Sequence, residues 1–72
     1  MNNLNVAKIQ LNGNSYEINA KTNLNQLLNK LKIENSKVAI EVNGTIIEKI
    51  KYPKFILNKD DKVEIVHFIG GG

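Results

Sequence analysis

Three consecutive glycines, Gly70, Gly71 and Gly72, stand at the end of the sequence, and they are the residues whose chemistry stands out. Glycine has no Cβ, so such a run adopts most backbone conformations and fits a narrow slot in another protein. An enzyme that threads this segment would bring the Gly72 carboxylate against a nucleotide phosphate. We therefore expect Gly72 to react, with Gly70 and Gly71 providing reach. Three glycines are also typical of a frayed terminus, so the interpretation depends on what precedes them.

The segment before the glycines, residues 62–69, is predicted to be the last and longest strand, and it is apolar on both sides. A strand with one solvated face alternates more cleanly. A central position in the sheet, with both faces buried, would explain the apolar residues in the first half of this strand and would bury part of Val66. Phe68 and Ile69 lie too near the end for full burial. We therefore expect Val66, Phe68 and Ile69 to form an exposed patch on which a partner docks.

Other chemistry has little support in the sequence. There is no cysteine, which excludes disulfides, thiolate-bound zinc and a thiol nucleophile. His67 is the only histidine, and its role stays open. Asp60, Asp61 and Glu64 lack the spacing of a calcium loop and indicate a solvated turn. No phosphate-binding loop, nucleophile elbow or dinucleotide fingerprint is present, so we expect no metal site, no bound cofactor and no enzyme activity.

Two Asn-Gly pairs mark tight hairpins, because both residues tolerate positive φ. Asn12-Gly13 joins predicted strands at 6–11 and 15–19, and Asn43-Gly44 joins strands at 38–42 and 45–48. Between the hairpins, Leu24, Leu27, Leu28 and Leu31 follow the 3.6-residue period of an amphipathic helix. Thr22 is the expected N-cap of this helix.

Residues 52–57 contain a proline among apolar residues and predict an irregular loop or a short 3₁₀ turn that closes one side of the core. Residues 58–61 form a polar turn before the last strand. The order is ββαβββ. It predicts an α+β fold in which one main helix covers a mixed five-stranded sheet, the β-grasp or ubiquitin-like roll. The 72 residues suffice for one such domain, 1–72, with a flexible tail at 69–72.

The formal net charge is +3, from ten lysines and no arginine against seven acidic residues. The lysines are scattered, whereas nucleic-acid binders cluster their charge and favour arginine. We expect a solvated surface and no nucleic-acid partner. No apolar run approaches the roughly 20 residues that span a bilayer. The first residues lack the basic start and apolar stretch of a signal peptide, so a cytoplasmic protein without a membrane partner is expected.

The chain resembles the ThiS family, the sulfur-carrier proteins of thiamine biosynthesis, over almost its whole length. The likeness is carried by Asn12-Gly13, residues 24–28, residues 38–44 and residues 61–72. The ending V-E-I-V-H-F-I-G-G-G is the most specific part. Family members often carry glycine where Asp60 stands, tryptophan where Tyr52 stands, and arginine where lysines stand here. These departures concern packing and surface rather than the tail.

The resemblance implies a definite chemistry for Gly72. A ThiF-like adenylating enzyme would use ATP to activate the Gly72 carboxylate. A sulfur donor such as a cysteine desulfurase would then supply persulfide sulfur, which leaves a thiocarboxylate. A ThiG-like thiazole synthase would accept the sulfur for the thiazole ring of thiamine. The chain would be a co-substrate, with no cofactor of its own.

Three alternatives remain open from the sequence. The small subunit of molybdopterin synthase uses the same terminal thiocarboxylate, but it is usually longer. A ubiquitin-like modifier would form isopeptide bonds to lysines of other proteins. A basic binding module, for instance for RNA, would bind in a way that weakens steeply with salt.

Overall fold

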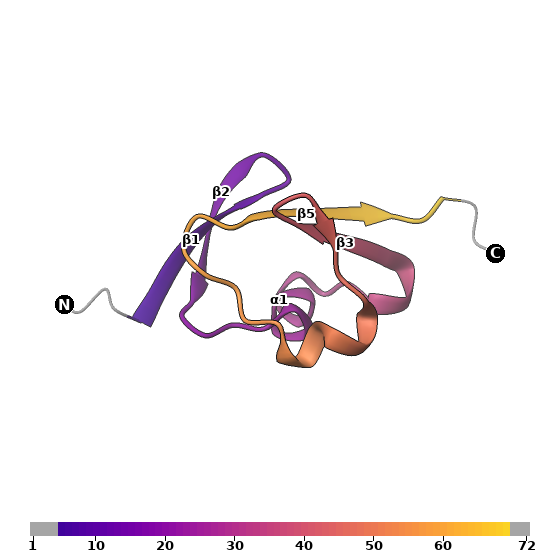
Figure 1. Ribbon diagram of the computed structural model, residues 1–72, viewed down its shortest axis with the longest axis horizontal. Coiled ribbons are helices and arrows are strands. Elements are labelled where there is room, and N and C mark those ends of the chain that lie inside the picture. Colours follow the sequence, from indigo (N-terminus) through magenta and orange to yellow (C-terminus); the bar gives the residue numbers. More distant parts are fainter. Residues whose placement is uncertain (1–4, 70–72) are drawn as a thin grey trace.

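A computed structural model describes residues 5–69 of the chain. The described residues form five strands, one α-helix and the 3₁₀ helices η2 and η3 (Figure 1). In chain order these are β1 (Val6–Leu11), β2 (Asn14–Asn19), α1 (Leu24–Leu31), η2 (Asn35–Lys37), β3 (Val38–Val42), β4 (Thr45–Ile46), η3 (Lys49–Lys54) and β5 (Lys62–His67). The predicted ββαβββ order of strands and main helix is confirmed.

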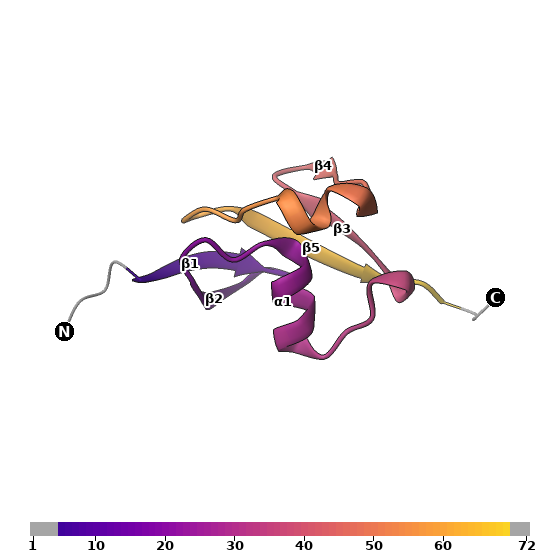
Figure 2. The ribbon, with the colours of Figure 1, turned by 90° about the horizontal axis from the view of Figure 1, so that it is seen from below.

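The five strands form one mixed sheet in the order β2-β1-β5-β3-β4. β5 is last in the chain but central in the sheet, parallel to β1 and antiparallel to β3. The two hairpins, β1–β2 and β3–β4, are antiparallel and flank it. Figures 1 and 2 show α1 and η3 together on one face of this sheet. The other face is open, and this arrangement is the predicted ubiquitin-like roll.

Both Asn-Gly pairs turn the chain as predicted. Asn12 and Gly13 have φ of 48° and 86°, and Asn43 and Gly44 have φ of 52° and 85°. Two successive positive φ values give the turn whose twist matches that of the flanking strands. Asp60 also has a positive φ, 69°, so the turn before β5 is kept without glycine.

The cap of α1 differs from the prediction. Asn23, not Thr22, is the N-cap: its Oδ1 accepts a hydrogen bond from Gln26 N–H at 2.8 Å. Gln26 Oε1 accepts one from Asn23 N–H at 2.9 Å, which completes a capping box. The Thr22 hydroxyl instead donates to the carbonyl of Asn19. Asparagine and threonine are both good caps, so local sequence did not separate the two adjacent positions.

The core lies between the sheet and the layer of α1 and η3. Its buried side chains are Ile9, Ile18, Leu24, Leu27, Leu28, Val38, Ile40, Val42, Tyr52, Leu57, Val63 and Ile65. The leucine stripe therefore faces the core, although Leu31 is only half-buried. The predicted 3₁₀ plug is also confirmed, and it begins earlier than expected, at Lys49. Its Tyr52 side chain is fully buried.

Tyr52 brings a hydroxyl group into this core. Within the described part of the chain, Tyr52 Oη has no hydrogen-bond partner. Burial raises the pKa of the Tyr52 hydroxyl above its ordinary value. The Ile40 backbone opposes this shift only in part, and its geometry is too poor for a hydrogen bond to Oη. Tyr52 therefore contributes mainly through the packing of its ring.

Two predicted strands are too long. β4 covers only Thr45–Ile46 rather than 45–48, because the chain turns at Glu48 into η3. β5 ends at His67 rather than continuing to Ile69. β5 is also buried on one face only: Val63 and Ile65 lie inside, whereas Val66 on the other face is 57% exposed. The expectation that this strand is buried on both faces is therefore wrong.

Candidate functional site

The strand β5 is paired on both of its sides, and β3 follows it to its end. Along β3, the antiparallel pairing reaches from Val42 opposite Val63 to Val38 opposite His67. Beyond the strand, Phe68 N–H still donates a hydrogen bond of 2.9 Å to the carbonyl of Lys37. On the β1 side, the parallel pairing covers the beginning of β5. The backbone is therefore fixed up to Phe68, four residues before the last glycine.

The asparagines of the two hairpin turns also bind β5 through their side chains. Asn12 Oδ1 accepts from Ile65 N–H at 2.7 Å, and Asn43 Oδ1 accepts from Lys62 N–H at 2.8 Å. Asn43 Nδ2 also donates to Asp61 at 3.0 Å. Asp61 thus helps to hold the turn before β5 together. The Asn-Gly pattern predicted the turns but carried no signal for these side-chain bonds.

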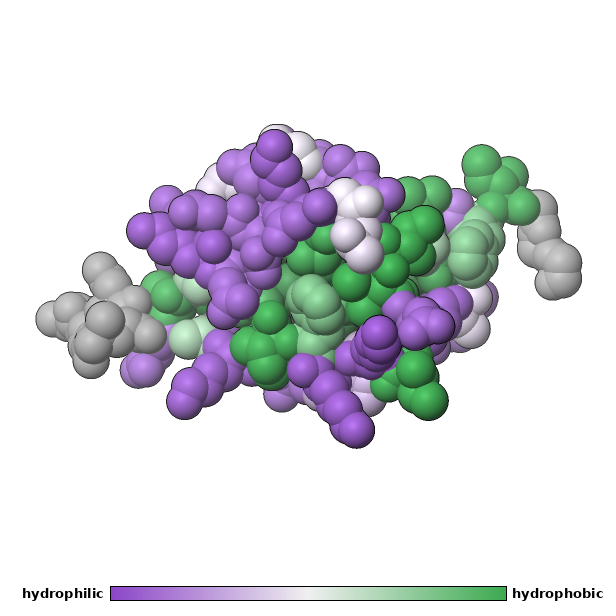
Figure 3. All heavy atoms as spheres, in the orientation of Figure 1, coloured by the Kyte–Doolittle hydropathy of each residue, from purple (hydrophilic) through white to green (hydrophobic). Residues whose placement is uncertain are grey.

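The three residues predicted to form a docking patch, Val66, Phe68 and Ile69, are all exposed. Their exposed fractions are 57%, 59% and 98%. Val66 is paired with Ala39 on the open face of the sheet, opposite to the face that carries Ile65. Figure 3 shows hydrophobic side chains protruding at the end of the molecule where β5 leads out. We call Val66, Phe68 and Ile69 the docking patch. Their exposure is as predicted, and docking itself stays a prediction.

Lys49 of η3 lies beside this patch and was not anticipated from the sequence. Its Nζ lies 5.1 Å from the centroid of the Phe68 ring, within the range of a cation–π contact. The neighbouring Ile50 is 81% exposed. Lys49 and Phe68 are 19 positions apart in the sequence, so no local pattern could have paired them.

The predicted reactive residue, Gly72, and its neighbours Gly70 and Gly71 lie outside the described residues. His67 is described and exposed at the end of β5. Within residues 5–69, no group of three or more His, Cys, Asp or Glu side chains is arranged to hold a metal ion. In the same range, no helix is both long enough and apolar enough to cross a membrane.

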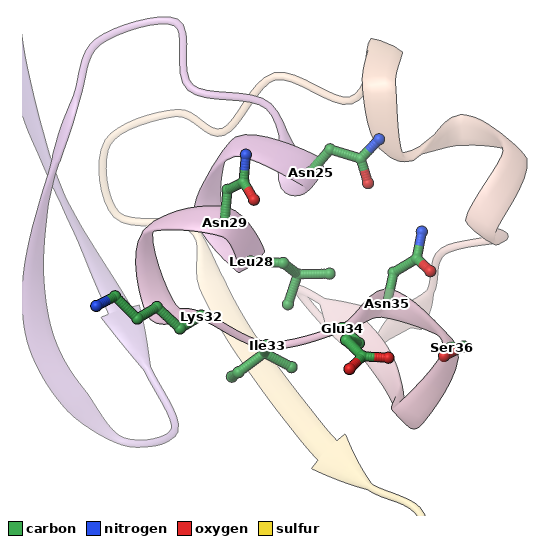
Figure 4. A pocket seen from close by; sticks show the side chains of 8 residues that line it. All are labelled: Asn25, Leu28, Asn29, Lys32, Ile33, Glu34, Asn35 and Ser36. Atoms are coloured by element: carbon green, nitrogen blue, oxygen red, sulfur yellow. The ribbon is translucent and has the colours of Figure 1, made fainter.

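An open groove of about 550 Å³ lies between α1 and η2. It is lined by Asn25, Leu28 and Asn29 of the helix and by residues 32–36. Figure 4 shows Leu28 in the middle of the groove, surrounded by polar side chains such as Asn35 and Glu34. Its lining thus combines amide, carboxylate, hydroxyl and ammonium groups around the apolar Leu28 and Ile33.

Comparison with known proteins agrees with this architecture. The family model of the ThiS family matches residues 9–72. The sulfur carrier protein ThiS of Bacillus subtilis is 40% identical over 65 residues, which cover 89% of this chain and 98% of that protein. The crystal structure of a thiamine biosynthesis protein (ThiS) from Geobacter metallireducens superimposes with a TM-score of 0.79 at 28% identity, over 90% of this chain and 99% of that chain.

A thiazole synthase of Magnetococcus marinus is 43% identical over 65 residues, or 90% of this chain. The chain spans only 20% of the length of that protein, and 20% of a similar thiazole synthase of Paramagnetospirillum magneticum. The family match, by contrast, extends over most of the chain and includes the final glycines. Together with the ubiquitin-like fold, it shows that this chain belongs to the ThiS family.

Proposed function

We propose that this protein carries sulfur on the carboxylate of Gly72 for formation of the thiazole ring in thiamine biosynthesis. The observation that carries the proposal is the family match over residues 9–72, which includes the glycine ending. The geometry supports it. A backbone held up to Phe68 presents the exposed docking patch immediately before the glycines, so a partner that binds the patch also receives Gly72.

The chemistry begins with activation, because a carboxylate is a poor electrophile. A Gly72 oxygen attacks the α-phosphorus of ATP, and pyrophosphate leaves. The terminal sulfur of a donor persulfide then attacks the acyl carbon and displaces AMP. A thiol cleaves the resulting sulfur–sulfur bond, which forms a disulfide and leaves the thiocarboxylate on Gly72. The chain itself supplies no catalytic group and acts as a co-substrate.

We assign three partners to these steps. A ThiF-like enzyme binds ATP and performs the adenylation, and a cysteine desulfurase or a similar enzyme supplies the persulfide. A ThiG-like thiazole synthase accepts the sulfur. Similarity to two thiazole synthases supports this acceptor over a molybdopterin synthase subunit. All these steps belong in the cytoplasm.

Intact mass spectrometry tests the proposal. We would incubate the purified protein with the ThiF-like enzyme of its host, ATP, a persulfide donor and a thiol. A species heavier by one oxygen-to-sulfur exchange is expected, and alkylation of its sulfur should map to Gly72. A variant without Gly72 should not gain this mass, whereas Lys59→Met, in the polar turn before β5, should react normally. Absence of the heavier species from the wild type under these conditions would contradict the proposal.

A further inference from the structure

Lys49 is the one charged side chain that the structure shows in contact with an aromatic ring of the docking patch. Its ammonium lies 5.1 Å from the centroid of the Phe68 ring. The Phe68 N–H donates a hydrogen bond of 2.9 Å to the Lys37 carbonyl, which fixes the backbone from which the ring projects. Phe68, directly after β5, is thus linked to the last residue of η2 by a backbone hydrogen bond and to the first residue of η3 by the cation–π contact.

This lysine has no carboxylate partner among the described residues. The one ion pair in that part of the chain joins Lys51 to Glu48, at 3.5 Å. Glu48, the sequence neighbour of Lys49, is thereby engaged by another lysine. The side of the docking patch next to η3 therefore combines a positive charge with the exposed apolar surface of Phe68.

A partner that covers the Phe68 ring while Lys49 keeps the position seen in the structure also covers the ammonium beside it. Burying an ammonium without a counter-charge carries a desolvation penalty, and this penalty weakens binding of the partner. A purely apolar pocket would therefore bind this surface poorly. A pocket with a carboxylate at its rim would bind it well and would discriminate against carriers without the lysine.

We infer that Lys49 determines partner specificity: the activating enzyme presents a carboxylate beside the apolar pocket that takes Phe68, and this carboxylate pairs with Lys49. The inference rests on the proposed function, since it concerns the enzyme that adenylates Gly72. The competing possibility is that Lys49 swings into solvent when Phe68 is bound.

The test is ATP–pyrophosphate exchange by the ThiF-like enzyme of the host, measured against carrier concentration. Lys49→Met keeps most of the side-chain length but removes the charge, and it should raise KM for the carrier about tenfold with kcat unchanged. Lys49→Arg retains a cation over the ring and should stay within about twofold of the wild type. Lys49→Glu should be the weakest substrate. Lys59→Met, a lysine in the turn before β5, serves as the matched control.

Ionic strength separates charge pairing from simple positioning of the ring. The KM of the wild type should rise with salt, and the difference between wild type and Lys49→Met should shrink, because screening weakens the pair. Equal KM values for the wild type and Lys49→Met at low salt, with normal exchange by both, would overturn the inference alone. A wild-type protein that supports no exchange would instead refute the proposed function.

Discussion

Asn12 Oδ1 accepts a hydrogen bond of 2.7 Å from the backbone N–H of Ile65, 53 residues further along the chain. Asn12 N–H also donates to the Val63 carbonyl at 2.9 Å. The last paired residues of the parallel β1–β5 ladder are Leu11 and Val63, so Asn12 lies just beyond the end of the ladder. Its side chain extends that ladder from Val63 to Ile65, two residues further along β5. The turn of the first hairpin thus stabilises the strand that precedes the three glycines in the sequence.

The first prediction concerns this bond. Asn12→Gly keeps the positive φ but leaves Ile65 N–H without its acceptor, so we expect the free energy of unfolding to fall by about 1–2 kcal/mol. For a domain of this size the melting temperature would fall by roughly 4–8 °C per kcal/mol. Asn12→Asp keeps the acceptor oxygen and should lose less. Thermal and urea unfolding of the three proteins measure the difference, and equal stability of Asn12→Gly and wild type would contradict it.

The second prediction concerns the buried hydroxyl of Tyr52. Because Oη has no partner among the described residues, Tyr52→Phe removes a desolvated polar atom and keeps the ring. We expect the free energy of unfolding to stay equal or to rise by up to about 1 kcal/mol. Urea unfolding at neutral pH measures it. A loss above about 2 kcal/mol would show that the hydroxyl makes a stabilising bond.

The third prediction is that the Tyr52 hydroxyl makes the stability of the protein depend on pH. Burial raises the pKa of folded Tyr52 above the value of about 10 in the unfolded chain. The stability associated with Tyr52 is therefore fully present below pH of about 10 and is lost as the pH rises through the folded pKa. Above pH 10, wild-type stability should fall more steeply than that of Tyr52→Phe. All other titratable groups are the same in both proteins, so the difference between the two curves isolates Tyr52. Parallel curves would contradict the prediction.

The fourth prediction separates the two adjacent capping candidates of α1. Asn23→Ala removes the cap and the capping box, and should cost about 1 kcal/mol of unfolding free energy. Thr22→Ala loses one hydroxyl bond to Asn19 and should cost less. Chemical denaturation of both variants gives the ranking, and a larger loss in Thr22→Ala would reverse the assignment of the cap.

The fifth prediction tests the docking patch. Phe68→Ala should leave stability almost unchanged, because the ring is 59% exposed, but should raise KM in adenylation about tenfold or more. Ile46→Ala is the matched control: Ile46 is 68% exposed on β4 and lies outside the patch. Melting curves and the exchange assay together give both readouts. Similar KM values for the two variants would place the docking surface elsewhere.

Much of the architecture was predictable from local patterns. The Asn-Gly turns, the leucine stripe of α1 and the 3₁₀ segment around Pro53 each have a signal within a few residues, and each is present in the structure. The ending of the chain, together with its resemblance to the ThiS family, also predicted the family and the exposure of Phe68 and Ile69. Neighbouring residues encode such features because backbone preference and hydrophobic period act locally.

The sequence by itself determined the order of strands and main helix, the 3₁₀ segment around Pro53, the family and the residues proposed to react. Tertiary structure alone decided how those residues are supported. The pairing of β5 with both β1 and β3, the bond from Asn12 to Ile65 and the contact of Lys49 with Phe68 join residues far apart in the chain. The tertiary structure also decided that β5 has one open face, because α1 and η3 cover only one side of the sheet. Such contacts depend on the packing of whole elements, and no short pattern of residues contains them.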